Sequence, residues 1–345
     1  MRMSSVLAWV AVVMFAGACD GERPDGTAKQ GVTAGRSNSA LGDAAGVPVA
    51  AAGKDGSASS FEGVAFSSKH WKPPADSEIP NDSMGASIRR GLALVTNTTD
   101  SLPAYAPGKI NCTSCHLDGG RSVEAAALSG SHARFPKYME RTGAVITLAD
   151  RVNYCFTRSL AGTQLPATSR EMEDILAYLA FISRGVPTGA RTPGADGLVK
   201  MAALVGDTLR GAARFATTCA VCHGADGQGG AGRIPALWGP KSYSVGASMA
   251  REERAASFIW HNMPLGQGRT LAPQQAYDLA AYINSRPRPD SPGKEKDWPM
   301  GGAPKDVPYN TAGHAAYKPP PVLPRRNPAG AVVPKPARAS SMVRS

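Results

Sequence analysis

Apolar residues recur with the spacing of an amphipathic helix at two places in the chain. Between residues 175 and 182 they follow the i, i+1, i+4, i+7 pattern of one helix face, and residues 279–283 repeat the i, i+4 spacing. The pair Thr168-Ser169 is a suitable start for the first helix, and Pro273 suits the first turn of the second. A further helix is expected over residues 206–218. The pattern therefore predicts a mainly α-helical protein.

Another apolar run, Val6 to Phe15, follows Arg2 and is too short to span a bilayer comfortably. Residues 1–18 are therefore predicted to be a secretory signal peptide, which implies a periplasmic protein. Small residues precede Cys19, and this fits either an ordinary cleavage or a lipoprotein cut that makes Cys19 a lipid anchor. The chain contains no second apolar run of about 20 residues, which excludes a polytopic membrane protein.

Composition sets two terminal regions apart from the body of the chain. Residues 19–65 are dominated by Gly, Ala, Ser and Thr and are expected to form a flexible low-complexity linker. Residues 291–345 form a Pro-rich basic tail, which contributes to the net charge of +11. This tail either attracts an acidic redox partner or an anionic surface, or is solvated without a partner. Its Lys and Arg residues are interleaved with Pro rather than with aromatics, so nucleic-acid binding is not expected.

An internal repeat organises the region between these two ends. The segments Cys112-Thr-Ser-Cys-His and Cys219-Ala-Val-Cys-His share the motif C-x-x-C-H, and one of the two predicted helices follows each of them. The repeat predicts two similar helical domains, over residues 66–187 and 203–290, joined by a linker over 188–202.

The motif C-x-x-C-H is the attachment signature of c-type haem, in which two thiols bind the porphyrin and the His ligates the iron. Two covalently bound haem c groups are therefore expected, one on Cys112, Cys115 and His116 and the other on Cys219, Cys222 and His223. The alternative is zinc held by the same side chains in tetrahedral sites. The predicted fold class is mainly α, with two tandem cytochrome c domains and disordered N- and C-terminal extensions.

Each iron then needs a sixth ligand or an open face. Met263 lies before the last predicted helix, a position typical of a cytochrome c ligand, with His261 as a competing nitrogen ligand and a core Met as the alternative. Cys155 occupies the equivalent place after the first motif, where a thiolate would lower the haem potential. The alternatives for Cys155 are a small buried residue or a disulfide with Cys19.

Three arginines, Arg141, Arg151 and Arg158, flank Cys155. We expect them to depress the pKa of this thiol and to attract anions, although each alone is more often a surface charge. Ser159 lies at i+4 from Cys155, so a helical turn would place it beside the thiolate.

These residues resemble those of the dihaem cytochrome c type of thiosulfate dehydrogenase. The resemblance covers roughly residues 66–286 and rests on Cys112-Thr-Ser-Cys-His-Leu-Asp-Gly-Gly, Arg151-Val-Asn-Tyr-Cys-Phe-Thr-Arg-Ser159, Gly162 with Leu165-Pro166, and Asn262-Met-Pro264. It implies a catalytic iron with His116 and Cys155 as ligands, substrate contacts from Arg141, Arg151 and Ser159, and a second, electron-transfer iron with His223 and Met263 as ligands. Some members carry a Lys beside the equivalent of Met263, where this chain has Asn262, so plain His/Met ligation is predicted.

The resemblance implies that two thiosulfates are joined to tetrathionate and that two electrons pass to a periplasmic acceptor such as a cytochrome c. Arginine forks would offset the repulsion between the two dianions. Our hypothesis is that Cys155 leaves the iron and bonds to the sulfane sulfur of one thiosulfate, and that the second thiosulfate attacks this adduct. The alternatives are tetrathionate reduction by the reverse steps, a Sox-type haem subunit that acts with a carrier protein, and a dihaem electron-transfer cytochrome without a substrate.

Overall fold

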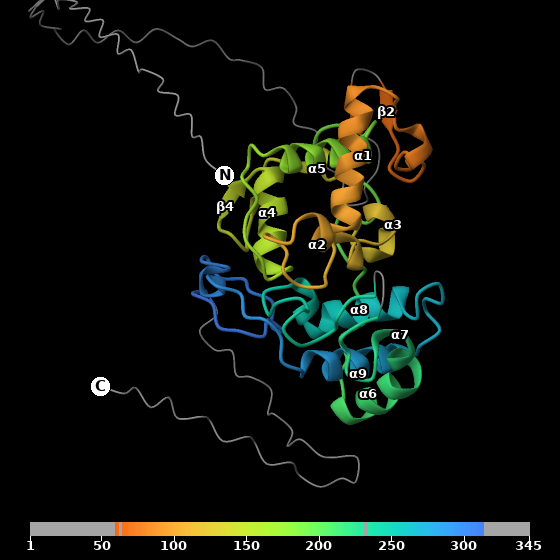
Figure 1. Cartoon of the computed structure of the whole chain (residues 1–345), viewed down its shortest axis with the longest axis vertical. Helices are drawn as coiled ribbons and strands as arrows, with labels where there is room; N and C mark the ends of the chain where they lie inside the picture. The colour runs from red at the N-terminus through yellow and green to blue at the C-terminus, as the bar shows by residue number, and fades with distance from the viewer. Residues whose placement is uncertain (1–58, 62–63, 231–233, 314–345) are drawn as a thin grey trace, which may run out of the picture. The chain divides into compact units, whose positions relative to one another are not determined.

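The structure is a computed structural model that describes residues 59–61, 64–230 and 234–313 (Figure 1). The predicted signal peptide, Cys19, most of the predicted linker and the chain beyond residue 313 lie outside these residues. Within the described ranges, no helix is both long enough and apolar enough to cross a membrane.

Helices dominate the described chain, as the sequence pattern predicts. They are α1 (Ser83–Thr96), α2 (Thr98–Ser101), α3 (Leu117–Gly120), α4 (Leu148–Arg158), α5 (Arg170–Phe181), α6 (Thr208–Arg214), α7 (Ala220–His223), α8 (Glu252–Asn262) and α9 (Pro273–Asn284). The strands form two antiparallel hairpins, β1 (Ser59–Phe61) with β2 (Val64–Phe66), and β3 (Lys137–Met139) with β4 (Ala144–Ile146). Ser59 pairs with Phe66 and Lys137 with Ile146.

The two helices predicted from apolar spacing are present as α5 and α9. The Ser169 side chain accepts a hydrogen bond from the Met172 N–H, which is the expected N-cap, and Pro273 opens α9. The helix expected over residues 206–218 is α6, and it continues through a π-helical turn, Phe215–Cys219, into the second C-x-x-C-H motif.

In the first half, α1 crosses α5 at close range (Figure 1). Ile88 and Val95 of α1 share a buried core with Ile175 of α5. At the crossing, Gly91 lies against α5 so closely that an added Cβ would be 2.0 Å from the Asp174 carbonyl oxygen. No residue but glycine fits this contact without separating the helices.

The second half repeats this crossing with α6 and α9 (Figure 1). A Cβ added at Gly211 would lie 2.0 Å from the carbonyl oxygen of Asp278. An ion pair closes each crossing: Arg90 donates to Asp174 at 2.6 Å, and Arg210 donates to Asp278 at 2.7 Å. The repeat inferred from the Cys motifs therefore extends to the helix that precedes each of them.

The segment between the two halves is packed against both of them. Gly189 N–H donates to the Ala133 carbonyl at 2.8 Å, and Leu198 is buried in a small core with Phe258 of α8. The Ser257 hydroxyl donates to the Val199 carbonyl at 2.5 Å. The predicted linker over 188–202 thus makes specific contacts along its length.

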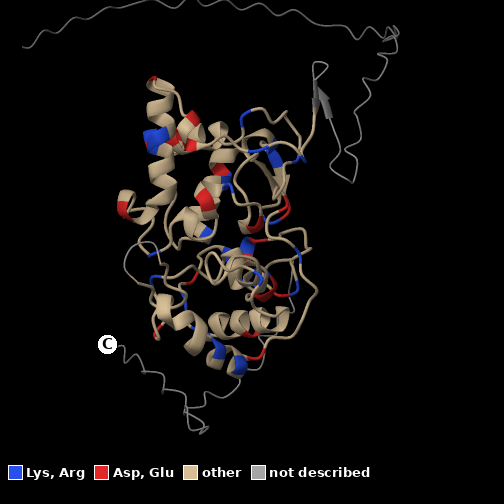
Figure 2. Cartoon of the chain, turned by 90° about the vertical axis from the view of Figure 1, so that its right-hand side faces the viewer, with Lys and Arg blue, Asp and Glu red and all other residues tan. Residues whose placement is uncertain are grey.

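Residues 291–313, the first part of the tail predicted over 291–345, are folded, and this part of the prediction is wrong. Trp298, Val307 and Tyr309 are buried together and anchor this segment. These three apolar residues are scattered in a segment rich in Pro and Lys, so its composition does not indicate a buried core. At the other end, the last residues of the predicted flexible linker pair in the β1–β2 hairpin. Lys and Arg residues lie among Asp and Glu residues throughout the described chain (Figure 2).

Candidate active site

The first C-x-x-C-H motif follows α2 and opens with a short 3-10 turn, Cys112–Ser114. The Cys112 N–H donates to the Thr98 hydroxyl at 3.1 Å, which fixes the start of the motif. Burial raises the pKa of Cys112 to about 11 and that of Cys115 to about 12.

The two motif histidines are held in the same way. His116 Nδ1 lies 2.6 Å from the Ala126 carbonyl oxygen, and His223 Nδ1 lies 3.2 Å from the Pro235 carbonyl oxygen. A carbonyl oxygen can only accept, so each Nδ1 carries a proton and each ring presents its Nε2 on the side away from this bond. This is the arrangement found behind metal-ligating histidines.

Cys155 lies on α4, whose first turn is capped by Thr147 and Asp150. Its sulfur accepts a hydrogen bond from Arg151 Nη1 at 2.7 Å. Burial alone would raise the pKa of this thiol, but the Arg151 charge and the neighbouring His116 imidazole outweigh burial and lower the pKa to about 6. The structure thus brings together His116, Cys155 and Arg151, three of the predicted site residues.

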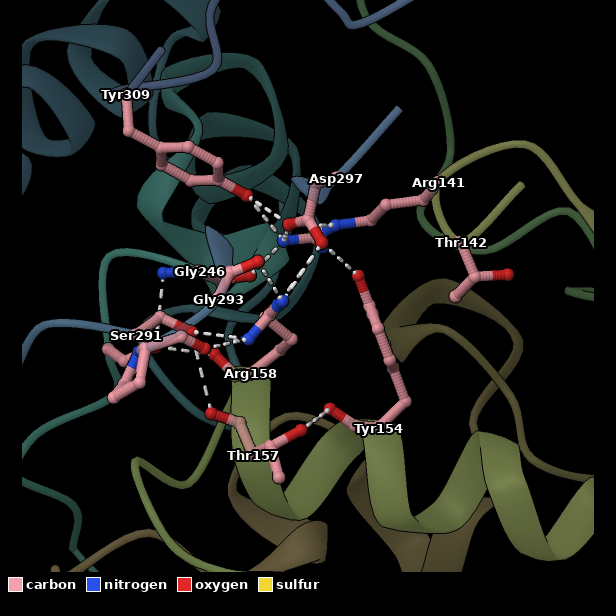
Figure 3. Close-up of polar contacts among 12 residues, drawn as sticks. Arg141, Thr142, Tyr154, Thr157, Arg158, Gly246, Ser291, Gly293, Asp297 and Tyr309 are labelled. Atoms are coloured by element: carbon pink, nitrogen blue, oxygen red, sulfur yellow. Dashed lines mark hydrogen bonds and ion pairs between the residues drawn. The ribbon is translucent and has the colours of Figure 1, made fainter. Parts of the chain in front are cut away.

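The other two arginines are directed elsewhere. All three arginines were predicted to act on the Cys155 thiol, but Arg141 and Arg158 both bind the carboxylate of Asp297 (Figure 3). Arg141 donates through Nε and Nη2, which leaves Nη1 without a hydrogen-bond partner among the described residues. Ser159 caps α4, and its N–H donates to the Cys155 carbonyl at 2.8 Å. The substrate-contact roles of Arg141 and Ser159 remain predictions.

A cavity of about 900 Å³ is lined by both halves of the chain and touches both C-x-x-C-H motifs, with Cys115 of the first among its lining residues. Its lining is mostly apolar and includes Cys219, Cys222, His223, Ile234, Leu237, Ile259, Met263 and Leu271. A large planar apolar group such as haem fits a cavity of this size and lining, with the two thiols and the imidazole at its wall. Among the described residues, no three His, Cys, Asp or Glu side chains lie close enough to hold a metal ion by themselves.

Met263 follows α8 directly and lines this cavity. His261, the competing ligand, is buried with its Nδ1 2.8 Å from the Ser257 carbonyl oxygen, and its ring packs edge-on against Trp260. Asn262, between them, donates through Nδ2 to the Glu124 carbonyl oxygen of the first half at 3.1 Å. Met263 is among the residues that line the cavity and His261 is not, which favours Met263 as the residue facing a bound group.

Two families match the chain in tandem. Residues 104–188 match the SoxA/TsdA cytochrome c domain, and residues 209–287 match cytochrome c. The first range contains His116, Arg151 and Cys155, and the second contains His223 and Met263. The fold class, two tandem cytochrome c domains in a mainly helical chain, is therefore confirmed.

Relatives that match about two thirds of the chain decide the family. A thiosulfate dehydrogenase from Psychrobacter arcticus is 43% identical over 242 residues, which cover 68% of this chain and 74% of the relative. The chain belongs to the thiosulfate dehydrogenase family. Another thiosulfate dehydrogenase, from Allochromatium vinosum, is 38% identical over 63% of this chain and 83% of its own length.

A solved thiosulfate dehydrogenase, TsdBA from Marichromatium purpuratum in its as-isolated form, has the same fold with a TM-score of 0.62 and 32% identity. The match covers 67% of this chain and 53% of that one, so this chain spans about half of the solved chain. The resemblance to thiosulfate dehydrogenases inferred from the motifs is thus confirmed, and with it the assignment to haem-binding oxidoreductases.

Sequence reasoning missed the acidic partner of the site helix. Asp297 lies 139 positions after Arg158, and Tyr309 lies further on, in a stretch that composition marks as tail. Their only local signal is a pair of aromatic residues, Trp298 and Tyr309, in an otherwise Pro- and Lys-rich segment. The carbonyl partners of the motif histidines carry no side-chain signal at all.

Proposed function

We propose that the protein oxidises two thiosulfates to tetrathionate and passes two electrons to a periplasmic acceptor such as a small cytochrome c. The observation that carries this proposal is the contact of Arg151 with the Cys155 sulfur next to the motif histidine His116. A thiolate beside a guanidinium provides both a sulfur nucleophile and a binding group for an anionic sulfur compound.

The chain's residues fit two covalently bound haem c groups. Cys112 and Cys115 would attach one group, with His116 and Cys155 as its axial ligands. The second motif would attach the other, with axial ligands His223 and Met263 at the cavity described above. When bound, the two haems supply two one-electron acceptors for a two-electron oxidation.

The chemistry of the chain itself is sulfur transfer through Cys155. Arg151 holds the thiosulfate dianion and keeps the Cys155 sulfur ionised. The thiolate forms a bond to the sulfane sulfur of one thiosulfate, and this step releases two electrons and leaves the adduct Cβ–Sγ–S–SO₃⁻ on Cys155. The sulfane sulfur of a second thiosulfate attacks the adduct at its sulfane sulfur, so that the Cys155 thiolate departs and tetrathionate forms.

Arg151→Gln is expected to lower kcat/KM for thiosulfate by about 10²-fold. The substitution removes the positive charge that would bind the substrate and that stabilises the Cys155 thiolate. The pKa of Cys155 would rise, so less of it is ionised at neutral pH. Steady-state kinetics with an artificial acceptor measure the effect. Arg151→Lys retains the charge without the fork and should recover part of the loss; equal activity of the Gln variant and the wild type would refute this role.

An anaerobic titration of the haem-loaded ferric protein with thiosulfate tests the function itself. We expect the visible haem bands to shift to the reduced form while tetrathionate accumulates in a ratio of one per two electrons. Absence of reduction at full haem loading, with tetrathionate also failing to oxidise the reduced protein, would rule out both directions of the reaction.

We further propose that residues 1–18 export the protein to the periplasm and that Cys19 carries a lipid anchor. Fractionation of cells that produce the wild type and Cys19→Ser tests this. The wild type should partition with membranes until detergent is added, whereas the variant should be released with the periplasmic fraction. Cytoplasmic retention of the wild type would contradict export.

A further inference from the structure

The folded segment after α9 contains an almost fully buried carboxylate, with 3% of the Asp297 side chain exposed. One of its oxygens, Oδ1, accepts from the Tyr154 hydroxyl at 2.6 Å and from Arg158 Nη2 at 3.1 Å (Figure 3). The other, Oδ2, accepts from Arg141 Nη2 at 2.9 Å and from the Tyr309 hydroxyl at 2.8 Å. Every lone-pair direction of this carboxylate therefore has a donor.

The negative charge of Asp297 balances the positive charges of Arg141 and Arg158. Burial raises the pKa of Asp297, but the Arg141 charge and the hydrogen bonds from Tyr154, Tyr309 and Arg158 lower it, so the carboxylate is ionised. The Arg141 and Arg158 side chains are only 15% and 11% exposed. Without Asp297, two largely buried guanidiniums would face each other with no counter-charge.

Two of these partners come from the helix that carries the reactive cysteine. Tyr154 and Arg158 stand one position before and three positions after Cys155 on α4, and Figure 3 shows both side chains directed from this helix to Asp297. Arg158 also donates to the carbonyl oxygens of Pro292 at 2.7 Å and Gly293 at 2.8 Å. The last turn of α4 is therefore bound to the segment after α9 at several points.

This contact fixes how α4 is rotated about its own axis. Side chains at −1 and +3 relative to Cys155 are held by Asp297, while Arg151, at −4, reaches the Cys155 sulfur. A helix pinned on one side cannot turn without displacing the residues on the other. A small displacement of a reacting group costs about 10²-fold in rate.

We propose that Asp297 is a positioning residue for Cys155: through Tyr154 and Arg158 it locks α4 onto the segment after α9, and through Arg141 it holds the turn of the β3–β4 hairpin beside this helix. The inference deepens the proposed function, since it takes Cys155 as the reactive group of the first site. The segment that supplies Asp297 lies after residue 287, where the cytochrome c family match ends. Asp297 therefore acts on the catalytic domain from a segment that belongs to neither matched cytochrome c domain.

Asp297→Asn, made in the full-length haem-loaded protein, tests this, with Asp306→Asn as the matched control. Asp306 lies on the same segment and pairs with Arg251 at 2.7 Å, beside α8 rather than α4. Two readouts report on α4: hydrogen–deuterium exchange of residues 152–158, and the low-spin ferric EPR signal of the first haem. Asp297→Asn should speed exchange there at least about tenfold and split the EPR signal into more than one ligation state. Asp306→Asn should leave both unchanged.

Kinetics separate positioning from general destabilisation. Asp297→Asn should lower kcat about tenfold with KM for thiosulfate within about twofold of the wild-type value, because ground-state binding by Arg151 is retained. If Asp297→Asn fails to fold, Tyr309→Phe removes a single hydrogen bond to the same carboxylate and should give smaller shifts of the same sign. Wild-type exchange and EPR in Asp297→Asn, or equal effects in Asp306→Asn, would overturn the proposal.

The two proposals can fail separately. A wild-type protein without thiosulfate turnover would refute the proposed function, while the exchange of α4 in Asp297→Asn would still report whether Asp297 holds this helix. Normal turnover with unchanged exchange would instead refute the positioning role alone.

Discussion

Replacing Cys155 with serine is expected to lower thiosulfate turnover by on the order of 10³-fold or more, while both haems remain attached. The hydroxyl of serine is not ionised at neutral pH, whereas the Cys155 thiol, with Arg151 at 2.7 Å, has its pKa lowered to about 6. Serine therefore provides no nucleophile for the sulfane sulfur and no soft ligand for iron. Turnover by the purified, haem-loaded variant measures the loss.

The matched control is Thr157→Ala, which changes a side chain two positions along the same helix. Its hydroxyl donates within α4 to the Asn153 carbonyl, so its removal leaves the thiol and Arg151 in place. We expect activity within about twofold of wild type. Should the Cys155→Ser protein keep more than a tenth of wild-type turnover with intact haem spectra, the covalent role of the thiol would be wrong.

The second large effect is expected at the two helix crossings. Gly91→Val and Gly211→Val each place a β-branched side chain where even a Cβ would be 2.0 Å from a backbone oxygen. Neither helix can yield without opening its core, so we expect a loss of at least about 3 kcal/mol in the free energy of unfolding. Gly91→Val should damage the first half and its haem signal, and Gly211→Val the second.

Thermal unfolding followed through the haem absorption bands, together with haem content per chain, measures both variants. Ala213→Val serves as the control, because Ala213 lies on the same short helix as Gly211 but is exposed. It should unfold close to the wild-type temperature. If Gly91→Val and Gly211→Val unfolded at the same temperature as Ala213→Val, the helix crossings would not be as tightly packed as described.

Features that depend on neighbouring residues could be predicted from the sequence. The helices α5 and α9 follow from apolar spacing, and the haem motifs follow from four or five consecutive residues. Cys155 was found because the second motif, with Met263, indicated how far along the chain to look. The helices and the motifs use a pattern that a short stretch of chain contains by itself, whereas Cys155 follows from the internal repeat.

Features that depend on distant residues could not be predicted. Arg141 and Arg158 lie in the expected part of the chain, but their partner Asp297 is 156 and 139 positions away. No local sequence pattern distinguishes an arginine that binds a substrate from one that binds a buried carboxylate. The helix α1 was missed although Ile88, Leu92 and Val95 follow the i, i+4, i+7 spacing of a helix face; only the role of Gly91 depends on a distant contact, with Asp174.

The short segment Glu124–Ala126 contacts the ligand-bearing parts of both halves. The Ala126 carbonyl accepts a hydrogen bond from His116 Nδ1. The Glu124 carbonyl accepts a hydrogen bond from Asn262, next to Met263, and the Glu124 carboxylate pairs with Arg269. The regions of two predicted iron ligands, His116 and Met263, are therefore held by the same short segment. In the proposed function two electrons pass to two haems, and electron tunnelling falls steeply with distance, so this shared contact would help to keep the separation of the two centres constant.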